Sequence, residues 1–406
     1  MQRIVFVNFH ADWMLLRVAM VYVFKYSAAI KHKYLLDYLL ANPDKYEVCN
    51  FINDRGFSLF TNGDGAIMKL LNKLSGLENY ITLKKNGIKP NTIKVIRDPH
   101  DIQKDDIVIA YNVNHEQLRG LSEINAFKAL SLLHFHGRDG EAQDIMNAKI
   151  DCLFAETDLS KTSEIFRRYY PLNLPWIVHP FVFGERFKNM KPFSERQNKC
   201  FSTGTITYKK HPEFLAVYDD PCDQPARKFV KDNPDFFSGT VDSYSSDYLE
   251  DNPGKTILPS DNVVVRLYKK IYNRTHVGKQ KKYFSFNMVE KFNDYKMHLV
   301  GEEILGVPGI GFVEGMACGS AYIGLDSPMY RDLGLIPGVH YITYDGTKEG
   351  LRSTVEYYQK PEHQAELEQI AKTGCEFVRN NFRGDKVART LINKIDEAKD
   401  TKRIGK

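Results

Sequence analysis

The sequence predicts an α/β protein made of two doubly wound parallel sheets, and three observations support this class. The chain has 406 residues, more than one core usually holds, so two domains are expected. Apolar runs of strand length alternate with segments of helical spacing along most of the chain. The stretch 295–325 shows the unit most clearly, with a strand at 297–300, a glycine-rich loop at 301–309, a helix at 312–318 and a strand at 321–325.

Further elements follow the same alternation. In the first half, apolar runs predict strands at 4–9, 46–52, 93–96, 107–111, 126–133, 151–156 and 176–182, and helical spacing predicts helices at 26–40 and 161–169. In the second half we expect a strand at 199–205 and helices at 262–272, 347–359, 361–379 and 386–399. The polar segment 184–199 has the composition of a linker. The predicted division is therefore an N-terminal Rossmann-like domain at 1–185, a C-terminal one at 198–380, and a C-terminal helix with a basic tail at 381–406.

Residues 13–40 allow two interpretations. The apolar run 13–24 is too short to span a bilayer, which needs roughly 20 residues, and the helix at 26–40 carries a basic cluster at 31–33. One interpretation is a helix pair that covers the N-terminal sheet. The other is a surface that contacts lipid or a lipid-linked acceptor. We favour the first, because apolar helices of this length are usually buried in a core.

Composition and charge exclude several classes of protein. The net charge of +5 is too small to indicate nucleic-acid binding, but it is compatible with an anionic nucleotide or an anionic membrane surface. Six scattered cysteines have no metal-ligand spacing, so we expect reduced, buried thiols. The chain starts with a strand instead of a signal peptide. The expected localisation is cytoplasmic, with a peripheral membrane contact left open. Lysines and arginines also cluster between 266 and 282, where we expect most of them to face solvent.

The loop and helix at 301–318 carry the first candidate binding residues. Ligands of doubly wound sheets bind beyond the carboxyl ends of the strands, where loop amides favour an anion such as phosphate. Glu314 falls in the first turn of the predicted helix. A carboxylate there would repel phosphate, so its expected partner is neutral, such as the paired hydroxyls of a ribose.

The segment PGIGFVEGMACGSAYIG resembles the nucleotide-sugar site of retaining, group-1 glycosyltransferases of the GT-B fold, in which two Rossmann-like domains face a cleft. Residues 314–319, EGMACG, match the second half of the family motif. The motif's first glutamate, eight positions earlier, is replaced by Gly306. The resemblance implies that Glu314 holds the donor ribose and that amides near Gly309 and Ile310 face the diphosphate. The alternative is that these glycines only allow close packing of a helix on a strand.

Two more groups of residues match the family in their spacing. After the strand at 199–205, the family has a glycine followed by arginine and, a few residues later, a lysine. Gly204 and Lys209 fit this pattern, Lys210 is a second candidate for the lysine, and Thr205 replaces the arginine.

A histidine that faces the donor sugar follows a strand of the first domain in the family. His134 and His136, in the segment HFHGRDG, are the candidates for this catalytic role. Alternation along a strand places both on one face, with the residue between them on the other. The alternatives are hydrogen-bonded structural histidines or a metal pair.

Together these features predict a glycosyltransferase that moves a sugar from a UDP- or GDP-linked donor to a glycan or lipid-linked glycan acceptor. By the resemblance, the transfer proceeds with retention, in surface polysaccharide or glycoconjugate synthesis. No DxD pair follows a predicted strand, so we expect no metal and no cofactor, with amides and lysines neutralising the leaving diphosphate. The main alternative is a non-catalytic nucleotide- or glycan-binding protein of the same fold. A nucleotide-sugar epimerase or a phosphorylase ranks third.

Overall fold

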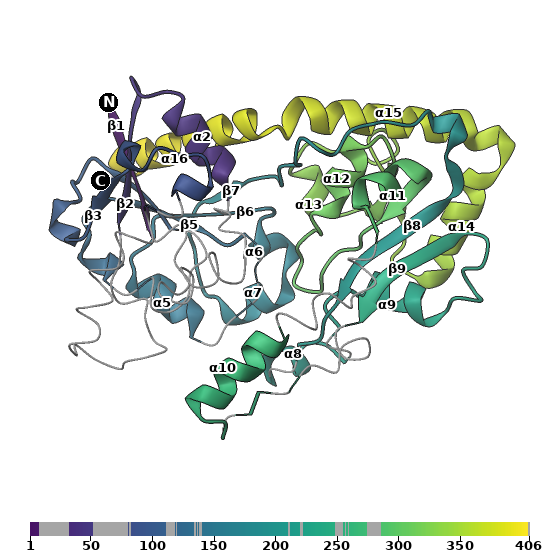
Figure 1. The fold of residues 1–406 in the computed structure, drawn as a ribbon, viewed down its shortest axis with the longest axis horizontal. Coiled ribbons are helices and arrows are strands. Elements are labelled where there is room, and N and C mark those ends of the chain that lie inside the picture. The colour runs from purple at the N-terminus through teal and green to yellow at the C-terminus, as the bar shows by residue number, and fades with distance from the viewer. Residues whose placement is uncertain are drawn as a thin grey trace. The chain divides into compact units, whose positions relative to one another are not determined.

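The computed structural model describes residues 1–7, 32–51, 80, 83–110, 118, 120–133, 135, 137, 140–209, 212–219, 222–247, 255, 257–258, 260–273 and 286–404. The chain divides into two compact units (Figure 1). Unit 1 comprises Met1–Asp158, Arg168–His179 and Gly384–Lys406, and unit 2 comprises Leu159–Arg167 and Pro180–Arg383. Unit 2 thus includes a short segment before residue 168 and the polar segment 184–199, and the C-terminal helix belongs to unit 1.

Unit 1 is built on a sheet of seven parallel strands in the order β3-β2-β1-β4-β5-β6-β7. These are β1 (Gln2–Val7), β2 (Tyr46–Phe51), β3 (Lys94–Ile96), β4 (Ile107–Ala110), β5 (Phe127–Ser131), β6 (Cys152–Ala155) and β7 (Trp176–Val178). The helices of this region are α2 (Lys33–Leu40), α5 (Glu141–Asn147), α6 (Leu159–Thr162), α7 (Glu164–Tyr169) and α16 (Gly384–Ile404), and its 3₁₀ turns are η2 (Pro90–Thr92), η3 (Pro99–Asp101) and η4 (Leu121–Glu123). The segments α6 and Glu164–Arg167 belong to unit 2.

The central strands of unit 1 are buried on both sides, as is usual for a parallel sheet with helices on both faces. Every residue of β4, β5 and β6 is buried. The predicted strands of this half are confirmed to within a few residues. Two predictions change: the helix expected at 161–169 is divided into α6 and α7 at Ser163, and of the helix expected at 26–40 the structure describes only the part that forms α2.

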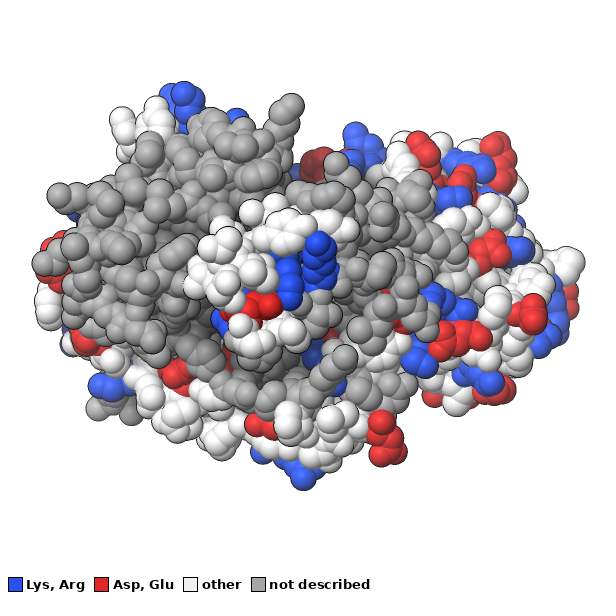
Figure 2. All heavy atoms as spheres, turned by 60° about the horizontal axis from the view of Figure 1, so that its bottom comes forward, with Lys and Arg blue, Asp and Glu red and all other residues white. Residues whose placement is uncertain are grey.

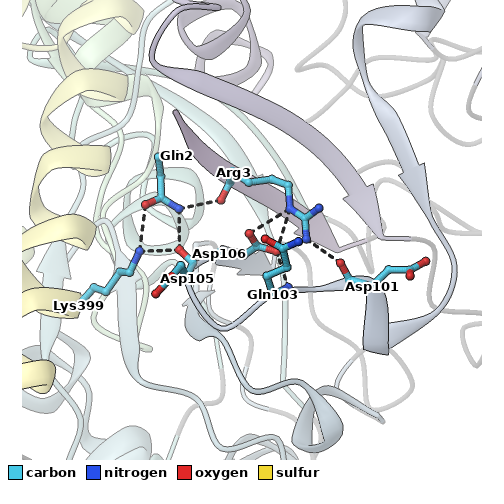
Figure 3. Close-up of polar contacts among 7 residues, drawn as sticks. All are labelled: Gln2, Arg3, Asp101, Gln103, Asp105, Asp106 and Lys399. Atoms are coloured by element: carbon cyan, nitrogen blue, oxygen red, sulfur yellow. Dashed lines mark hydrogen bonds and ion pairs between the residues drawn. The ribbon is translucent and has the colours of Figure 1, made fainter.

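A buried ion pair fixes the start of β1. The guanidinium of Arg3 donates to both carboxylate oxygens of Asp106, with the shortest contact at 2.6 Å, and to the carbonyl of Asp101 (Figure 3). The backbone N–H of Gln103 also donates to Asp106. Asp106 is 3% exposed. The Asp106 carboxylate therefore holds the turn before β4 against β1.

The C-terminal helix α16 packs on the first sheet. Its buried face, which includes Leu391 and Ile395, shares one core cluster with the buried face of α2 and with strands β1 and β4. Lys399 donates to the side chain of Gln2 at 3.0 Å and to the carbonyl of Asp105 at 2.7 Å (Figure 3). The last helix of the chain therefore stabilises the N-terminal unit.

Unit 2 contains a second parallel sheet, with five strands in the order β12-β11-β10-β8-β9. The strands are β8 (Gln197–Ile206), β9 (Val241–Asp247), β10 (Tyr295–Leu299), β11 (Ala321–Leu325) and β12 (Ile342–Tyr344). The remaining helices and turns are η5 (Phe193–Glu195), α8 (Pro212–Leu215), α9 (Pro225–Asp232), α10 (Val263–Tyr272), α11 (Met288–Asp294), α12 (Gly311–Ala317), α13 (Pro328–Arg331), α14 (Lys348–Gln359), η8 (Pro361–His363) and α15 (Gln364–Asn381).

Local sequence signals explain several of these boundaries. The side chain of Asn262 accepts a hydrogen bond from the N–H of Val265 and begins α10, and the hydroxyl of Thr347 accepts one from Gly350 and begins α14. The stretch at 295–325 forms the predicted strand, loop, helix and strand. The single helix expected at 361–379 is instead a 3₁₀ turn followed by α15. All six cysteines are buried and none forms a disulfide, as the sequence predicted.

Candidate functional site

The strand order of unit 2 reverses between β8 and β10. The chain runs from β8 outward to β9 on one side, and from β10 outward to β11 and β12 on the other. The segments that follow these two adjacent strands therefore diverge at the carboxyl edge of the sheet, which is where doubly wound sheets bind ligands. The corresponding reversal in unit 1 lies between β1 and β4, and the segments that follow those strands, 8–31 and 111–117, lie outside the described residues.

One arginine lies across the reversal point of unit 2. Arg227, on α9, donates through Nε to the carbonyl of Val300 at 2.5 Å and through Nη1 to the carbonyl of Thr205 at 2.7 Å. Its guanidinium thus joins the end of β8 to the end of β10. Arg227 is 6% exposed.

Two predicted site glycines make room for this arginine. A Cβ on Gly204 would lie 2.5 Å from the guanidinium carbon of Arg227, and one on Gly309 would lie 2.9 Å from its Nη2. Gly204 also has a φ of +131°, which side chains rarely adopt. The glycine at 204 is therefore explained by the neighbouring guanidinium. The sequence has no arginine next to Gly204, but the guanidinium of Arg227 reaches this glycine from α9.

Gly306 occupies the position where the family motif has its first glutamate. Its φ is +76°, and a Cβ there would lie 2.2 Å from the carbonyl oxygen of Thr162. No side chain fits this position without moving the backbone. The missing glutamate is therefore a consequence of how this loop packs on α6.

The carboxylate of the neighbouring Glu302 is hydrogen-bonded to other parts of the fold. Its Oε1 accepts hydrogen bonds from the hydroxyl of Tyr330 at 2.7 Å and from the backbone N–H of Leu325 at 2.9 Å, and the hydroxyl of Tyr322 lies 3.4 Å away. Glu302 is 7% exposed. This carboxylate ties the loop after β10 to the end of β11 and to α13, so it does not replace the missing glutamate at a ligand.

Glu314 has the features of a binding carboxylate. It lies in the first turn of α12 and is half-buried, and its carboxylate has no hydrogen-bond partner among the residues that the structure describes. Burial raises the pKa of Glu314 to about 7, and Arg186 opposes this shift. A buried carboxylate without a donor is unfavourable in the fold alone. Hydroxyl groups of a ligand would supply the missing donors.

Lys209 lies beside a buried acidic side chain. Its Nζ is 3.4 Å from Oδ2 of Asp223, which also accepts the hydroxyl hydrogen of Thr207. Burial raises the pKa of Asp223, and Lys209 and Arg227 oppose the shift. Burial likewise raises the pKa of Glu303, with Arg227 as the largest opposing charge. Two cations and two carboxylates therefore lie at the edge of β8 and β10.

The glycines of the EGMACG run have packing roles. A Cβ on Gly315 would lie 2.3 Å from Nε2 of His298, a fully buried histidine on β10 whose pKa burial lowers to about 3. Gly319 has a φ of +76°, and a Cβ there would lie 2.6 Å from the side-chain nitrogen of Asn189. Close packing of α12 on β10 thus explains Gly315, and the positive φ and the neighbouring Asn189 explain Gly319. Neither contact defines the role of Glu314.

Of the remaining predicted site residues, the structure describes Ile310 but not the two histidines or Lys210. His134, His136 and Lys210 lie outside the described residues. Phe135, between the two histidines, is buried, and its ring stacks edge-on against Tyr170 at 5.2 Å between centroids. Ile310 is 40% exposed, and its backbone N–H donates to no acceptor in the described part of the chain.

Within the described residues, no group of histidine, cysteine, aspartate and glutamate side chains is arranged to hold a metal ion. A helix that is long and apolar enough to cross a membrane is likewise not found in these ranges.

Solved structures resemble this chain over almost its whole length. The Anabaena protein Alr3699/HepE in complex with UDP-glucose aligns with a TM-score of 0.53 at 12% identity, covering 98% of this chain and 100% of that one. The same protein in complex with UDP and glucose aligns with a TM-score of 0.52 at 11% identity, with the same coverage. A glycosyltransferase from Rickettsia africae aligns less well, with a TM-score of 0.48 at 12% identity and 98% coverage of both chains.

The chain has the GT-B fold of glycosyltransferases. This confirms the predicted fold class, with one Rossmann-like sheet in each unit. No family model and no curated protein matches the sequence. The GT-B assignment therefore rests on the arrangement of strands and helices.

Proposed function

We propose that this protein transfers a sugar from a nucleotide-sugar donor to a glycan or lipid-linked glycan acceptor. The observation that carries the proposal is the half-buried carboxylate of Glu314, which has no partner in the described structure and lies beside the loop after β10. A ribose offers two adjacent hydroxyl donors, which suit one carboxylate. Transfer with retention, and a role in surface polysaccharide or glycoconjugate synthesis, are the finer parts of this proposal and come from the resemblance of the EGMACG run.

The diphosphate of the donor binds at the reversal point between β8 and β10. Arg227 and Lys209 supply two cations there, and Ile310 supplies a backbone N–H. Charge on the leaving diphosphate grows during transfer, so cations that are fixed in place stabilise the transition state without reorganising. A uridine donor is favoured over a guanosine donor, because the similar Anabaena protein was crystallised with UDP and with UDP-glucose.

Arg227→Gln tests the diphosphate site. Removing the guanidinium should weaken UDP binding by at least about tenfold, because a hydrogen bond to a charged group contributes about 1.5–3 kcal/mol. Uridine, which has no phosphate, is the control ligand. If Arg227 contacts the diphosphate, calorimetry should show lost affinity for UDP and unchanged affinity for uridine. Equal loss for both ligands would mean that Arg227 only braces the strand ends, and the diphosphate site would then be misplaced.

His134 and His136 are proposed to serve the sugar, one facing it and the other anchoring the loop. A contact that forms mainly in the transition state lowers turnover far more than nucleotide affinity when it is removed. We therefore expect one of His134→Ala and His136→Ala to reduce kcat while UDP affinity and melting temperature stay unchanged. If both variants keep full turnover while folded, the histidine loop has no part in the chemistry.

A further inference from the structure

The helix α10 has no buried residue, although more than half of its side chains are apolar. Val263, Val264 and Tyr268 are 61%, 75% and 53% exposed. Because successive residues of a helix are turned by about 100°, these three lie on one side together with the partly buried Leu267 and Ile271. The helix therefore turns an apolar side toward solvent, and Leu258, just before it, is 48% exposed.

The opposite side of α10 is basic. Arg266, Lys269 and Lys270 lie together there by the same spacing, and Lys269 is paired with Asp261 at 2.8 Å. Figure 2 brings forward the side of the molecule where α10 lies in Figure 1, and it shows lysine and arginine atoms next to uncharged surface. Lys255 lies 4.5 Å from the ring centres of Tyr268 and Tyr272, so a cation also adjoins the aromatic part of the apolar side.

The surrounding sequence concentrates positive charge on this part of the chain. Residues 255–282 contain eight lysines and arginines and one acidic residue, Asp261, which gives a net charge of +7. Because the whole chain carries +5, the rest of it carries −2. Among the described residues alone, Lys255, the three basic residues of α10 and Asp261 leave +3. The excess positive charge of the chain is therefore concentrated in residues 255–282.

We propose that α10 is a docking surface for an anionic membrane. A short helix with an apolar side and a basic side binds in the plane of a lipid surface, with its apolar side chains in the acyl boundary and its cations at the headgroups. Tyrosines such as Tyr268 and Tyr272 suit that interface, because their rings are apolar and their hydroxyls are polar. A partner that is only polyanionic would leave the exposed valines in water. The apolar side and the basic side of α10 together favour a lipid surface that carries negative charge.

Vesicle flotation with the full chain tests the proposal. Wild-type protein should float with vesicles of phosphatidylcholine and phosphatidylglycerol and stay unbound with phosphatidylcholine alone. Added salt should release it, because surface electrostatics are screened. Val264→Asp should lower the bound fraction, and Arg266→Glu combined with Lys270→Glu should lower partitioning at least about tenfold, because each basic residue near the surface contributes roughly a fivefold effect.

Matched controls lie elsewhere on unit 2. Val339 is 44% exposed and Lys372 is exposed on α15. Val339→Asp therefore introduces the same apolar-to-acidic change, and Lys372→Glu a charge reversal of the same kind, away from α10. Both should float like the wild type, and circular dichroism should show that all variants are folded. Equal loss in the control variants, or binding to heparin with no flotation on anionic vesicles, would overturn the proposal. Flotation that survives Val264→Asp would overturn the part assigned to the apolar side.

Discussion

Glu314→Gln should make the protein more stable and at the same time impair its donor site. The wild-type carboxylate is half-buried without a hydrogen-bond donor in the described structure, and its pKa is raised to about 7 by burial. Glutamine has nearly the same shape and carries no charge. The substitution therefore removes the buried charge while it leaves the packing of α12 in place.

The effect depends on pH in a defined direction. The pKa of Glu314 is higher in the folded state than its ordinary value of 4.5. The folded state therefore holds the proton more tightly, and stability falls as pH rises from about 4.5 through about 7. A pKa raised to this extent lowers the free energy of unfolding above pH 7 by about 3 kcal/mol. Solvent screens part of it at a half-buried side chain, so we expect Glu314→Gln to stabilise the protein by about 1–2 kcal/mol at pH 8 and by almost nothing at pH 5.

Urea unfolding at pH 5 and at pH 8 measures the difference in free energy of unfolding between wild type and Glu314→Gln. The transition to follow is the one that shifts when UDP is added. UDP affinity, measured by calorimetry, should fall by at least about tenfold, because hydrogen bonds to a charged acceptor are lost. Glu302→Gln, in the loop that precedes α12, is the matched control. Glu302 already accepts bonds from Tyr330 and Leu325, so its variant should lose about 1–2 kcal/mol at both pH values. If Glu314→Gln destabilises the protein at pH 8, or binds UDP as tightly as wild type, Glu314 is not a ribose-binding carboxylate.

Three further results are expected. Gly306→Glu restores the family glutamate, yet it should destabilise unit 2 by about 3 kcal/mol or more and gain no donor affinity, because φ is +76° and Thr162 leaves no room; a stable variant with tighter UDP binding would contradict this. Gly315→Ala should lower the melting temperature by crowding the buried His298, and an unchanged melting curve would mean that α12 can move away. Turnover of a UDP-sugar should survive excess EDTA, whereas loss that manganese or magnesium restores would show that metal stabilises the diphosphate.

The order of strands and helices could be predicted because it depends on local patterns. The strands Ile107–Ala110 and Ala321–Leu325 are buried on both faces, so their residues are almost all apolar. Such an apolar run can be recognised from the sequence alone. The loop after β10 and the position of Glu314 in the first turn of α12 followed in the same way. The GT-B fold was expected from one short motif and is confirmed by the strand order of both sheets.

The sequence by itself thus determined the fold class, the buried cysteines and the place of the candidate carboxylate, because spacing along the chain decides each of them. The tertiary structure decided which side chains meet. Arg227 reaches Gly204 from another helix, and Gly306 is a glycine because Thr162 fills the space beside it. Asp106 is the buried partner of Arg3, which lies about a hundred residues earlier in the chain. Contacts between residues far apart in the chain depend on how the elements pack, and no local pattern carries that information.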